Sequence, residues 1–363
     1  MDYKEYINGI KSFTDRLQDE ESREIFDARF DFCIYRDLDV LERKLISGAV
    51  RHGRNGESYI MNGFFRENPD RKKAPFVIFG AGRAGRASIR SLRFLGIKVV
   101  GCVDNNHASL ESAEELAVDS PERLLHDWKD CTVLISVANQ KMKSDIYRQL
   151  INMGIPASRI MNIREDYIWA DYGRQYFDLD VLQADTSGEI FVDAGCFDGE
   201  TGGGATVWAG GKLSKIYAFE ADRNSIDICR KRLEQTGCEF ELYHMATWSG
   251  KTTLTFNVNS DFGYASSVDA NGKEVVYADS IDNILAGRPA TYIKLDVEGS
   301  ELETLKGAVN TIKKYRPKMA VSLYHRAEDI IVLPLFIESL GMDYRYYIRH
   351  YQTRWCETTL YAF

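Results

Sequence analysis

Short apolar runs alternate with stretches of helical periodicity along most of the chain after residue 74. The first series of runs is rich in β-branched residues, which is typical of buried parallel strands. These runs span 75–80, 98–104, 131–137 and 158–162. Helical stretches such as 83–96 separate them. Strands that alternate with helices over about ninety residues predict an α/β domain with a doubly wound parallel sheet.

A second series of apolar runs begins near residue 189 and predicts seven more strands. They span 189–195, 214–220, 239–245, 291–297, 317–324, 342–351 and 357–363. The clearest helix is 300–315, where apolar residues fall on one face. The last two strands are joined by only about five residues, too few for a crossover helix, so we expect an antiparallel pair. By analogy of fold, a seven-stranded sheet that ends in such a hairpin matches the class I methyltransferase sheet.

The segment before residue 75 is polar, and its apolar residues recur at roughly helical intervals. We expect a helical appendage that serves packing or homo-oligomerisation. The sequence therefore predicts a helical segment over 1–74, a Rossmann-like module over 75–165 and a class I methyltransferase domain over 166–363.

Composition narrows the class of protein. The chain has 363 residues, is 44% hydrophobic and carries a net charge of −8, so no broad basic face for nucleic acid is expected. The chain has no run of eighteen apolar residues, so no membrane span is predicted. The first residues lack signal-peptide features, which favours a cytoplasmic protein. The seven cysteines form no CxxC pair and the six histidines no HxxxH or HExxH pair. Reduced thiols and no histidine-built metal site are expected.

The first glycine loop follows the strand at 75–80 and has the pattern GxGxxG. Its glycines are Gly80, Gly82 and Gly85, and Asp104 ends the next strand. This context is that of a dinucleotide-binding loop, so NAD or another nucleotide is a candidate ligand. However, the module has half the usual size of a dinucleotide domain. The alternative is that the glycines serve packing alone.

The second glycine loop has a carboxylate in front of it, Asp193, followed by Gly195 and Gly199. A carboxylate there would repel a pyrophosphate but suits a ligand that carries positive charge and no phosphate. S-adenosylmethionine, with its ammonium and sulfonium groups, meets both conditions. Glu220 ends the next strand, where an acid can accept hydrogen bonds from two ribose hydroxyls. The alternative for Asp193 is a helix or loop cap.

Charged residues gather at the end of the strand 291–297. Lys294, Asp296 and Glu298 fall on one side of it if the extended geometry continues, and Gly299 follows. Charges at the end of a buried strand are costly unless they serve a purpose, and open α/β sheets bind ligands at this edge. The alternative is that Lys294 and Asp296 pair with each other.

Taken together, these segments resemble the FkbM family of methyltransferases over about residues 173–363. The resemblance is carried by QYFDLD, FVDAGCFDGE, IYAFEAD, SSV at 266–268, YIKLDVEGSELETLKGA, VSLYHRAED and the closing YIRHY and TTLYAF. It implies S-adenosylmethionine-dependent O-methylation of a hydroxyl on a sugar, glycan or natural product. The cofactor-binding positions that it implies are Asp193, Gly195, Gly199, Glu220 and Asp296.

Two positions depart from the family pattern. Ala221 stands where the family usually has proline. Gly202, Gly203 and Gly204 lie where the helix after the second loop should begin. Glycine costs about 1 kcal/mol relative to alanine in a helix, so we expect this helix to start late and a mobile loop to cover the cofactor.

Methyl transfer to a hydroxyl needs a base, because the hydroxyl proton must leave. His325, in SLYHRAED, is the first candidate, and Asp296 or Glu298 is the alternative, with Lys294 in the same cluster. Asp296 could also bind Mg²⁺ through oxygens together with Glu298, Glu328 or Asp329. The tyrosine- and arginine-rich segment 343–355 could line the acceptor pocket, or form an ordinary half-buried hairpin.

Three functions therefore stay open from the sequence. The first is an O-methyltransferase with an accessory N-terminal module. The second is an NAD-dependent sugar-modifying enzyme whose chemistry lies in the first module, although that module has no Tyr-x-x-x-Lys pair. The third is a non-catalytic protein that binds a nucleotide or S-adenosylmethionine and acts as a scaffold.

Overall fold

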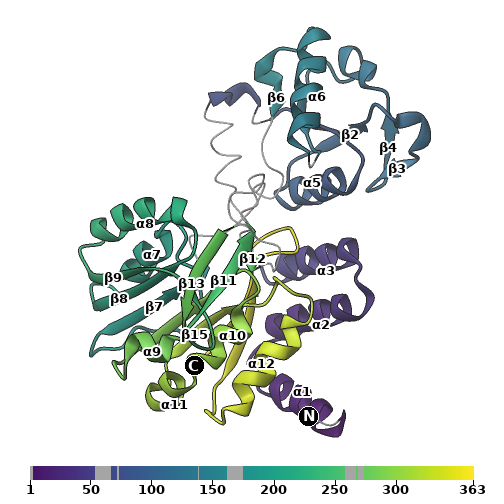
Figure 1. Cartoon of the computed structure of the whole chain (residues 1–363). Coiled ribbons are helices and arrows are strands. Elements are labelled where there is room, and N and C mark those ends of the chain that lie inside the picture. Colours follow the sequence, from purple (N-terminus) through teal and green to yellow (C-terminus); the bar gives the residue numbers. More distant parts are fainter. Residues whose placement is uncertain are drawn as a thin grey trace. The chain divides into compact units, whose positions relative to one another are not determined.

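A computed structural model gives the fold of the protein (Figure 1). It describes residues 3–53, 67–71, 73–137, 139–161, 175–257, 267–268 and 274–363. The SSV segment at 266–268, which contributes to the family resemblance, lies partly outside this range. The chain divides into two compact units. Unit 1 comprises Met1–Arg36, Gly173–His350 and Glu357–Phe363, and unit 2 comprises Asp37–Tyr172 and Tyr351–Cys356.

Unit 1 is built on a seven-stranded sheet in the order β16-β17-β15-β14-β7-β8-β9. Its strands, in chain order, are β7 (Glu189–Ala194), β8 (Leu213–Glu220), β9 (Glu239–His244), β14 (Tyr292–Leu295), β15 (Lys318–Ser322), β16 (Tyr346–His350) and β17 (Thr358–Ala362). Strands β7, β8, β9, β14 and β15 pair in parallel, and β17 is antiparallel to both β15 and β16. The predicted α/β class and the antiparallel terminal hairpin are confirmed.

Helices connect the parallel strands of this sheet and pack on it. Helix α7 follows β7, α8 follows β8, and the pair pack on these strands and on each other. The helices of this part of unit 1 are α7 (Glu200–Trp208), α8 (Arg223–Gln235), α9 (Ile281–Leu285), α10 (Glu301–Lys306), α11 (Val309–Tyr315) and α12 (Asp329–Ser339).

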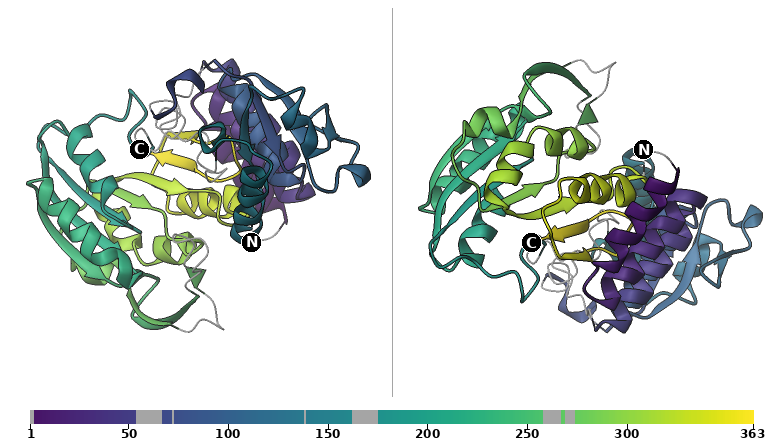
Figure 2. Two further views of the ribbon diagram at one scale, coloured as in Figure 1. Left: turned by 90° about the horizontal axis from the view of Figure 1, so that it is seen from above. Right: turned by 90° about the horizontal axis from the view of Figure 1, so that it is seen from below.

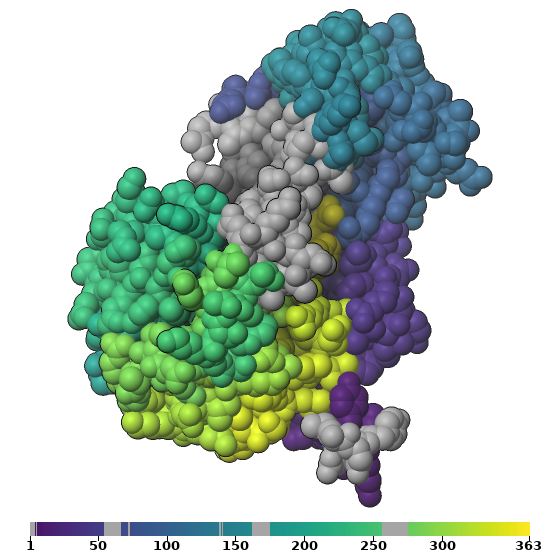
Figure 3. Space-filling view, viewed as in Figure 1, coloured from purple at the N-terminus to yellow at the C-terminus, as the bar shows by residue number. Residues whose placement is uncertain are grey.

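A second, four-stranded sheet in the order β10-β13-β11-β12 belongs to the same unit. Its strands are β10 (Ala246–Thr247), β11 (Thr252–Asn257), β12 (Ser267–Val268) and β13 (Glu274–Asp279). The green surface of β11 and β13 lies on the outside of the unit (Figure 3), and Val275 and Tyr277 of β13 are exposed. Sequence analysis did not predict this sheet.

The N-terminal helices are divided between the two units, unlike the single appendage expected over 1–74. Helices α1 (Tyr3–Asp15) and α2 (Glu20–Tyr35) pack on α12 and β16 of unit 1 (Figure 2). Phe13 and Phe26 are buried, and the ring of Phe13 lies 5.0 Å from that of Tyr346. Arg349 of β16 lies 2.6 Å from Asp19, the N-cap residue of α2. Apolar burial and this ion pair make residues 3–36 part of unit 1.

Unit 2 contains a six-stranded sheet in the order β3-β4-β2-β1-β5-β6. Its strands are β1 (Phe76–Phe79), β2 (Val99–Val103), β3 (Ser112–Ala113), β4 (Leu116–Asp119), β5 (Thr132–Ile135) and β6 (Ile160–Met161). The helices are α3 (Leu38–Arg51), α5 (Arg83–Phe94) and α6 (Gln140–Asn152), and short 3₁₀ turns lie at Pro69–Arg71, His107–Ser109, Pro121–Leu125 and Ala157–Arg159. All strand pairs are parallel except β3–β4.

A buried charge network joins α3 to α5 in unit 2. Glu42 of α3 is fully buried and forms ion pairs with Arg83 at 3.1 Å, with Arg90, and with Arg354 at 3.2 Å. Arg354 comes from the loop between β16 and β17, which is the part of the terminal hairpin that belongs to unit 2. Three arginines around one carboxylate compensate the cost of burying it.

No helix in the described ranges has both the length and the apolar composition that a bilayer crossing requires.

Candidate functional site

Three neighbouring parallel strands of unit 1 bring acidic residues to one edge of the sheet. Asp193 is the penultimate residue of β7, Glu220 is the last residue of β8, and Asp296 directly follows β14. Strand β7 lies between β8 and β14, so the chain reverses the direction in which it adds strands at this point. Ligands of open α/β sheets bind at the carboxyl edge where the strand order reverses.

Asp193 and Lys294 lie side by side on β7 and β14 and form a buried ion pair. Their backbones are directly paired in the sheet, and Lys294 Nζ lies 3.1 Å from Asp193 Oδ1. Lys294 also donates to the carbonyl oxygen of Gly195 at 2.5 Å. Burial alone would lower the pKa of Lys294, but Asp193 and Asp296 outweigh it and raise this pKa, so the ammonium stays charged. The lysine therefore pairs with Asp193, rather than primarily with Asp296 as the sequence alternative proposed.

The loop after β7 approaches the loop after β14 so closely that only glycine fits at position 195. Gly195 has φ +78°, and a Cβ there would lie 1.8 Å from the carbonyl oxygen of Asp296. The loop ends at Gly199, which has φ +84° and precedes the first residue of α7. Glu220 Oε2 accepts a hydrogen bond from the N–H of Phe197 at 2.7 Å, so the acid of β8 also holds this loop.

The three glycines after the loop lie inside α7, which begins at Glu200. The expectation that this helix starts late was therefore wrong. A Cβ at Gly202 would lie 2.5 Å from Leu233 Cδ2 of α8, and one at Gly204 would lie 3.0 Å from the ring of Phe177. Close packing of α7 against its neighbours compensates the poor helix propensity of glycine.

Gly202 and Gly203 provide a matched pair of variants. A Cβ at Gly203 meets no atom within 4 Å, so Gly203→Ala is expected to raise the free energy of unfolding by about 0.5–1 kcal/mol. Gly202→Ala forces a methyl group against buried Leu233 and is expected to lower it by about 1–3 kcal/mol. Urea denaturation of both variants tests this. Equal stabilisation by the two alanines would contradict the packing explanation.

Asp296 is held by two tyrosines that sequence analysis did not select. The hydroxyl of Tyr176 donates to Asp296 Oδ2 at 2.7 Å, and that of Tyr324 donates to Oδ1 at 3.0 Å. Tyr176 has φ +72° and is buried, and its ring lies 5.2 Å from Lys294 Nζ. Burial raises the pKa of Asp296, but Lys294 and His325 outweigh this, so the pKa is lowered overall. Asp296 is therefore ionised and fixed in orientation.

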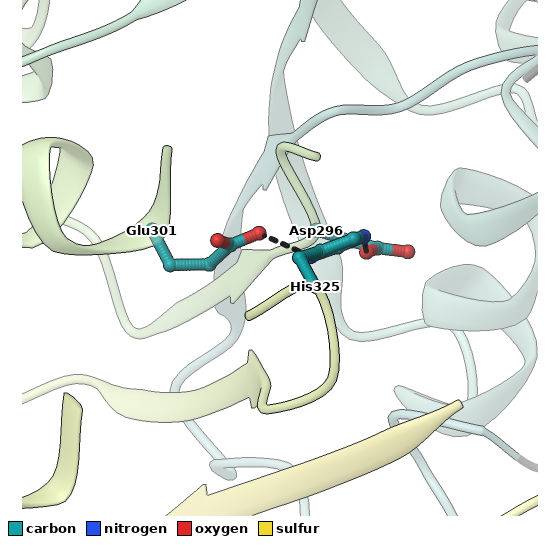
Figure 4. Close-up of side chains that lie close together, drawn as sticks. All are labelled: Asp296, Glu301 and His325. Carbon is teal, nitrogen blue, oxygen red and sulfur yellow. Dashed lines mark ion pairs between the residues drawn. The ribbon is translucent and has the colours of Figure 1, made fainter. Parts of the chain in front are cut away.

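His325 lies among three carboxylates and follows β15 (Figure 4). Its Nε2 lies 3.4 Å from both Asp296 Oδ1 and Glu298 Oε2, and its Nδ1 lies 2.8 Å from Glu301 Oε1. Burial alone would lower the pKa of His325, but Glu301, Asp296 and Glu298 raise it to about 10. In the free protein the ring is therefore an imidazolium at neutral pH.

Glu298 lies on the turn between β14 and α10, and Glu301 is the first residue of α10. Glu298 is in the left-handed region with φ +53°, a strained conformation for a residue other than glycine. Burial raises its pKa to about 8, with His325 opposing the increase. Glu301 is buried, and its Oε1 accepts the N–H of Val297 at 3.0 Å. Glu301 thereby fixes both the turn and His325.

The structure brings Asp193, Gly195, Glu220, Lys294, Asp296, Glu298 and His325 together along one edge of unit 1. Glu328 and Asp329, predicted as oxygen ligands with Asp296, have other partners. Glu328 lies 3.7 Å from Arg36, and Asp329 accepts the N–H of Arg326 at 2.7 Å.

The GxGxxG loop lies in unit 2, between β1 and α5. Gly80 has φ +116°, and Gly82 precedes the first residue of α5. A Cβ at Gly85 would lie 1.8 Å from the carbonyl oxygen of Gly80, which is a packing requirement. Both carboxylate oxygens of Asp104 accept backbone N–H groups, from Ala81 at 2.9 Å and Asn106 at 2.8 Å. The acid predicted to bind ribose is thus engaged within its own loops.

Residues 199–346 match the family described as the methyltransferase FkbM domain. This match supports an FkbM-type methyltransferase domain in that part of the chain. The resemblance to the FkbM family that the sequence predicted is confirmed. The match also supports the predicted class of enzyme, a methyltransferase. Residues 72–161 match a second family, described as C2185-like, N-terminal. No curated protein matches the chain.

Several solved structures are similar to this chain at low identity. The methyltransferase FkbM from Methylobacillus flagellatus is 20% identical over 89% of this chain and 98% of its own, with a TM-score of 0.48. A SAM-dependent methyltransferase from Aquifex aeolicus is 15% identical over 50% of this chain and 83% of its own, with a TM-score of 0.28. Trm1 from Pyrococcus horikoshii, in complex with S-adenosyl-L-methionine, is 13% identical over 48% and 50%, with a TM-score of 0.29. The family assignment does not rest on these likenesses.

Proposed function

We propose that the protein transfers a methyl group from S-adenosylmethionine to a hydroxyl group of a sugar, glycan or natural product. The observation that carries this proposal is the carboxyl edge of β7, β8 and β14, where Asp193, Glu220 and Asp296 lie at the ends of adjacent strands. The FkbM-domain match over residues 199–346 covers Glu220 and Asp296. S-adenosylmethionine would supply an activated methyl carbon at this edge. The role of the protein would then be to align the acceptor and the cofactor.

The residues at the edge fit this cofactor. Each oxygen of Glu220 accepts one backbone N–H, from Phe197 and from Asp222, and a carboxylate oxygen has capacity for a second donor such as a ribose hydroxyl. Asp193 Oδ2 has no hydrogen-bond partner among the described residues, so it can accept from an ammonium group. We assign the cofactor to Asp193, Gly195, Gly199 and Glu220, with Asp296 at its border.

The acceptor hydroxyl would face Asp296, Glu298 and His325. A hydroxyl must lose its proton as the methyl group moves, so a proton acceptor is needed nearby. The titratable side chains of this cluster lie at the same edge and could accept it. The imidazolium of His325 cannot accept a proton while it holds its own. We therefore assign proton removal to the cluster as a whole rather than to His325 alone.

The NAD-dependent alternative has less support, because Asp104 is engaged by Ala81 and Asn106. We assign unit 2 no redox chemistry. Gly80, Gly82 and Gly85 serve packing and the start of α5 in this proposal.

Glu220→Ala is expected to weaken S-adenosylmethionine binding at least about tenfold, because a charged hydrogen-bonding partner of the ribose is lost. Calorimetry on the full chain measures this. Glu220→Gln keeps the size of the side chain, so comparing the two variants separates loss of charge from collapse of the loop. Glu200→Ala, at a side chain that is 79% exposed, is the control and should bind as the wild type. Wild-type affinity in both Glu220 variants would refute the ribose role.

A further inference from the structure

His325 combines deep burial with ring nitrogens that have no well-aligned hydrogen-bond partner. Its side chain is only 8% exposed, yet neither Nδ1 nor Nε2 makes a hydrogen bond within the described ranges. Nε2 lies 3.4 Å from Asp296 Oδ1 and 3.4 Å from Glu298 Oε2. An unpaired polar atom at such depth is costly, so a further group that contacts it would stabilise the arrangement.

The separations are those of ligands around one metal ion. Ligand atoms about 2.1 Å from a tetrahedral centre lie about 3.4 Å from one another, and about 3.0 Å apart at an octahedral one. The separations of Nε2 from Asp296 Oδ1 and from Glu298 Oε2 match the tetrahedral spacing, and neither contact is a hydrogen bond. Asp296, Glu301 and His325 also each offer a ligand atom within 4.8 Å of the others.

Glu301 occupies the position of a partner behind a metal-bound histidine. It lies 2.8 Å from Nδ1, whereas Asp296 lies 3.4 Å from Nε2 (Figure 4). A histidine that binds a metal through one nitrogen commonly donates the other N–H to a carboxylate, which fixes the ring and its tautomer. Buried Glu301 also accepts the N–H of Val297, so its position is set by the backbone of the turn that carries Glu298.

A dication also suits the charges of the cluster, because the carboxylates of Asp296, Glu298 and Glu301 all lie around one imidazole. Lys294 is already paired with Asp193. A divalent cation that replaces the Nε2 proton would leave a neutral imidazole and balance two carboxylates, which reduces the cost of burying the cluster.

We propose that Asp296, Glu298 and His325 bind one divalent transition-metal cation, with Glu301 holding His325 at Nδ1. Two carboxylate oxygens and one imidazole nitrogen suit Mn²⁺ or Zn²⁺ and leave coordination positions open. The role of the cation rests on the proposed methyl transfer: a hydroxyl bound at an open position would lose its proton more readily, because the cation stabilises the alkoxide. The binding site itself does not depend on that role.

The test uses the full chain, treated with a chelator and then titrated with Mn²⁺, with free Mn²⁺ followed by electron paramagnetic resonance. We expect one saturable site. His325→Ala should weaken its affinity at least about tenfold, and Glu301→Gln should weaken it about tenfold through the orientation of the ring. Glu328→Gln is the control. Glu328 is a nearby acid that pairs with Arg36 instead, so this variant should leave the Mn²⁺ affinity unchanged.

Absence of a saturable site, or equal affinity in wild type and His325→Ala, would overturn the proposal and leave the imidazolium as the cation of the cluster. If His325→Ala does not fold, Glu298→Gln answers the same question, since the Glu298 side chain is 36% exposed and less involved in packing. Calorimetry with S-adenosylmethionine on the chelator-treated protein separates the two proposals. Cofactor binding without Mn²⁺ binding would reject the metal site alone.

Discussion

Lys294→Met is expected to lower the free energy of unfolding of unit 1 by about 3–5 kcal/mol. Asp193 is fully buried and Lys294 is 2% exposed, so the substitution leaves a carboxylate in the core without its cation. Removing one partner of a buried ion pair generally costs this much, because the remaining charge is no longer compensated. Urea denaturation followed by circular dichroism measures the effect. Stability equal to that of the wild type would mean that the pair contributes nothing.

A second substitution separates the structural role of Asp193 from its proposed role in cofactor binding. The double variant Asp193→Leu with Lys294→Met replaces the pair by apolar side chains and should recover most of the lost stability. If Asp193 serves the cofactor, this double variant folds but binds S-adenosylmethionine at least about tenfold more weakly. Unchanged affinity in the folded double variant would assign Asp193 to structure alone.

Glu42→Gln is expected to destabilise unit 2 by about 3 kcal/mol or more. The substitution removes the shared charge partner of Arg83, Arg90 and Arg354, and Arg90 itself is buried. Glu122→Gln, at an exposed acid of the same unit, is the matched control and should change stability by less than about 0.5 kcal/mol.

Thermal unfolding of the two unit 2 variants tests this prediction. S-adenosylmethionine affinity below the transition should equal that of the wild type, because the proposed cofactor residues all lie in unit 1. A melting temperature for Glu42→Gln that matches Glu122→Gln would show that the arginines find other partners.

The sheet of unit 1 was predictable because its central strands are continuous apolar runs. Burial on both faces imposes such runs, and the short connection between β16 and β17 determines that they are antiparallel. The acids at the strand ends were predictable for the same reason, since a strand end is visible as the point where the apolar run stops. Strands β11 and β13 were missed. TTLTFN does alternate threonine with apolar residues, and β13 exposes Val275 and Tyr277, so neither strand is the continuous apolar run that marks the central strands.

Contacts between distant segments account for the other differences. Tyr176 lies 120 positions before Asp296, so no local pattern relates them. The glycines of α7 have a helical conformation because Leu233 and Phe177 occupy the space that side chains would fill. The charge state of His325 depends on three carboxylates that come from a different connection of the sheet. Tertiary packing determines each of these features. Such contacts leave no periodic pattern of residues from which a single sequence could predict them.

The division of the chain has a consequence for how this protein can be dissected or recombined. The backbone passes between the units at Arg36, Tyr172, His350 and Cys356, so neither unit is one continuous stretch of sequence. A fragment that starts at Gly173 would lose α1 and α2, expose the apolar surface that Phe13 and Phe26 cover, and retain a hairpin tip whose Arg354 belongs with Glu42. Exchange of modules by a single crossover would therefore yield incomplete cores. A viable transplant of the methyltransferase unit has to carry three separate segments together.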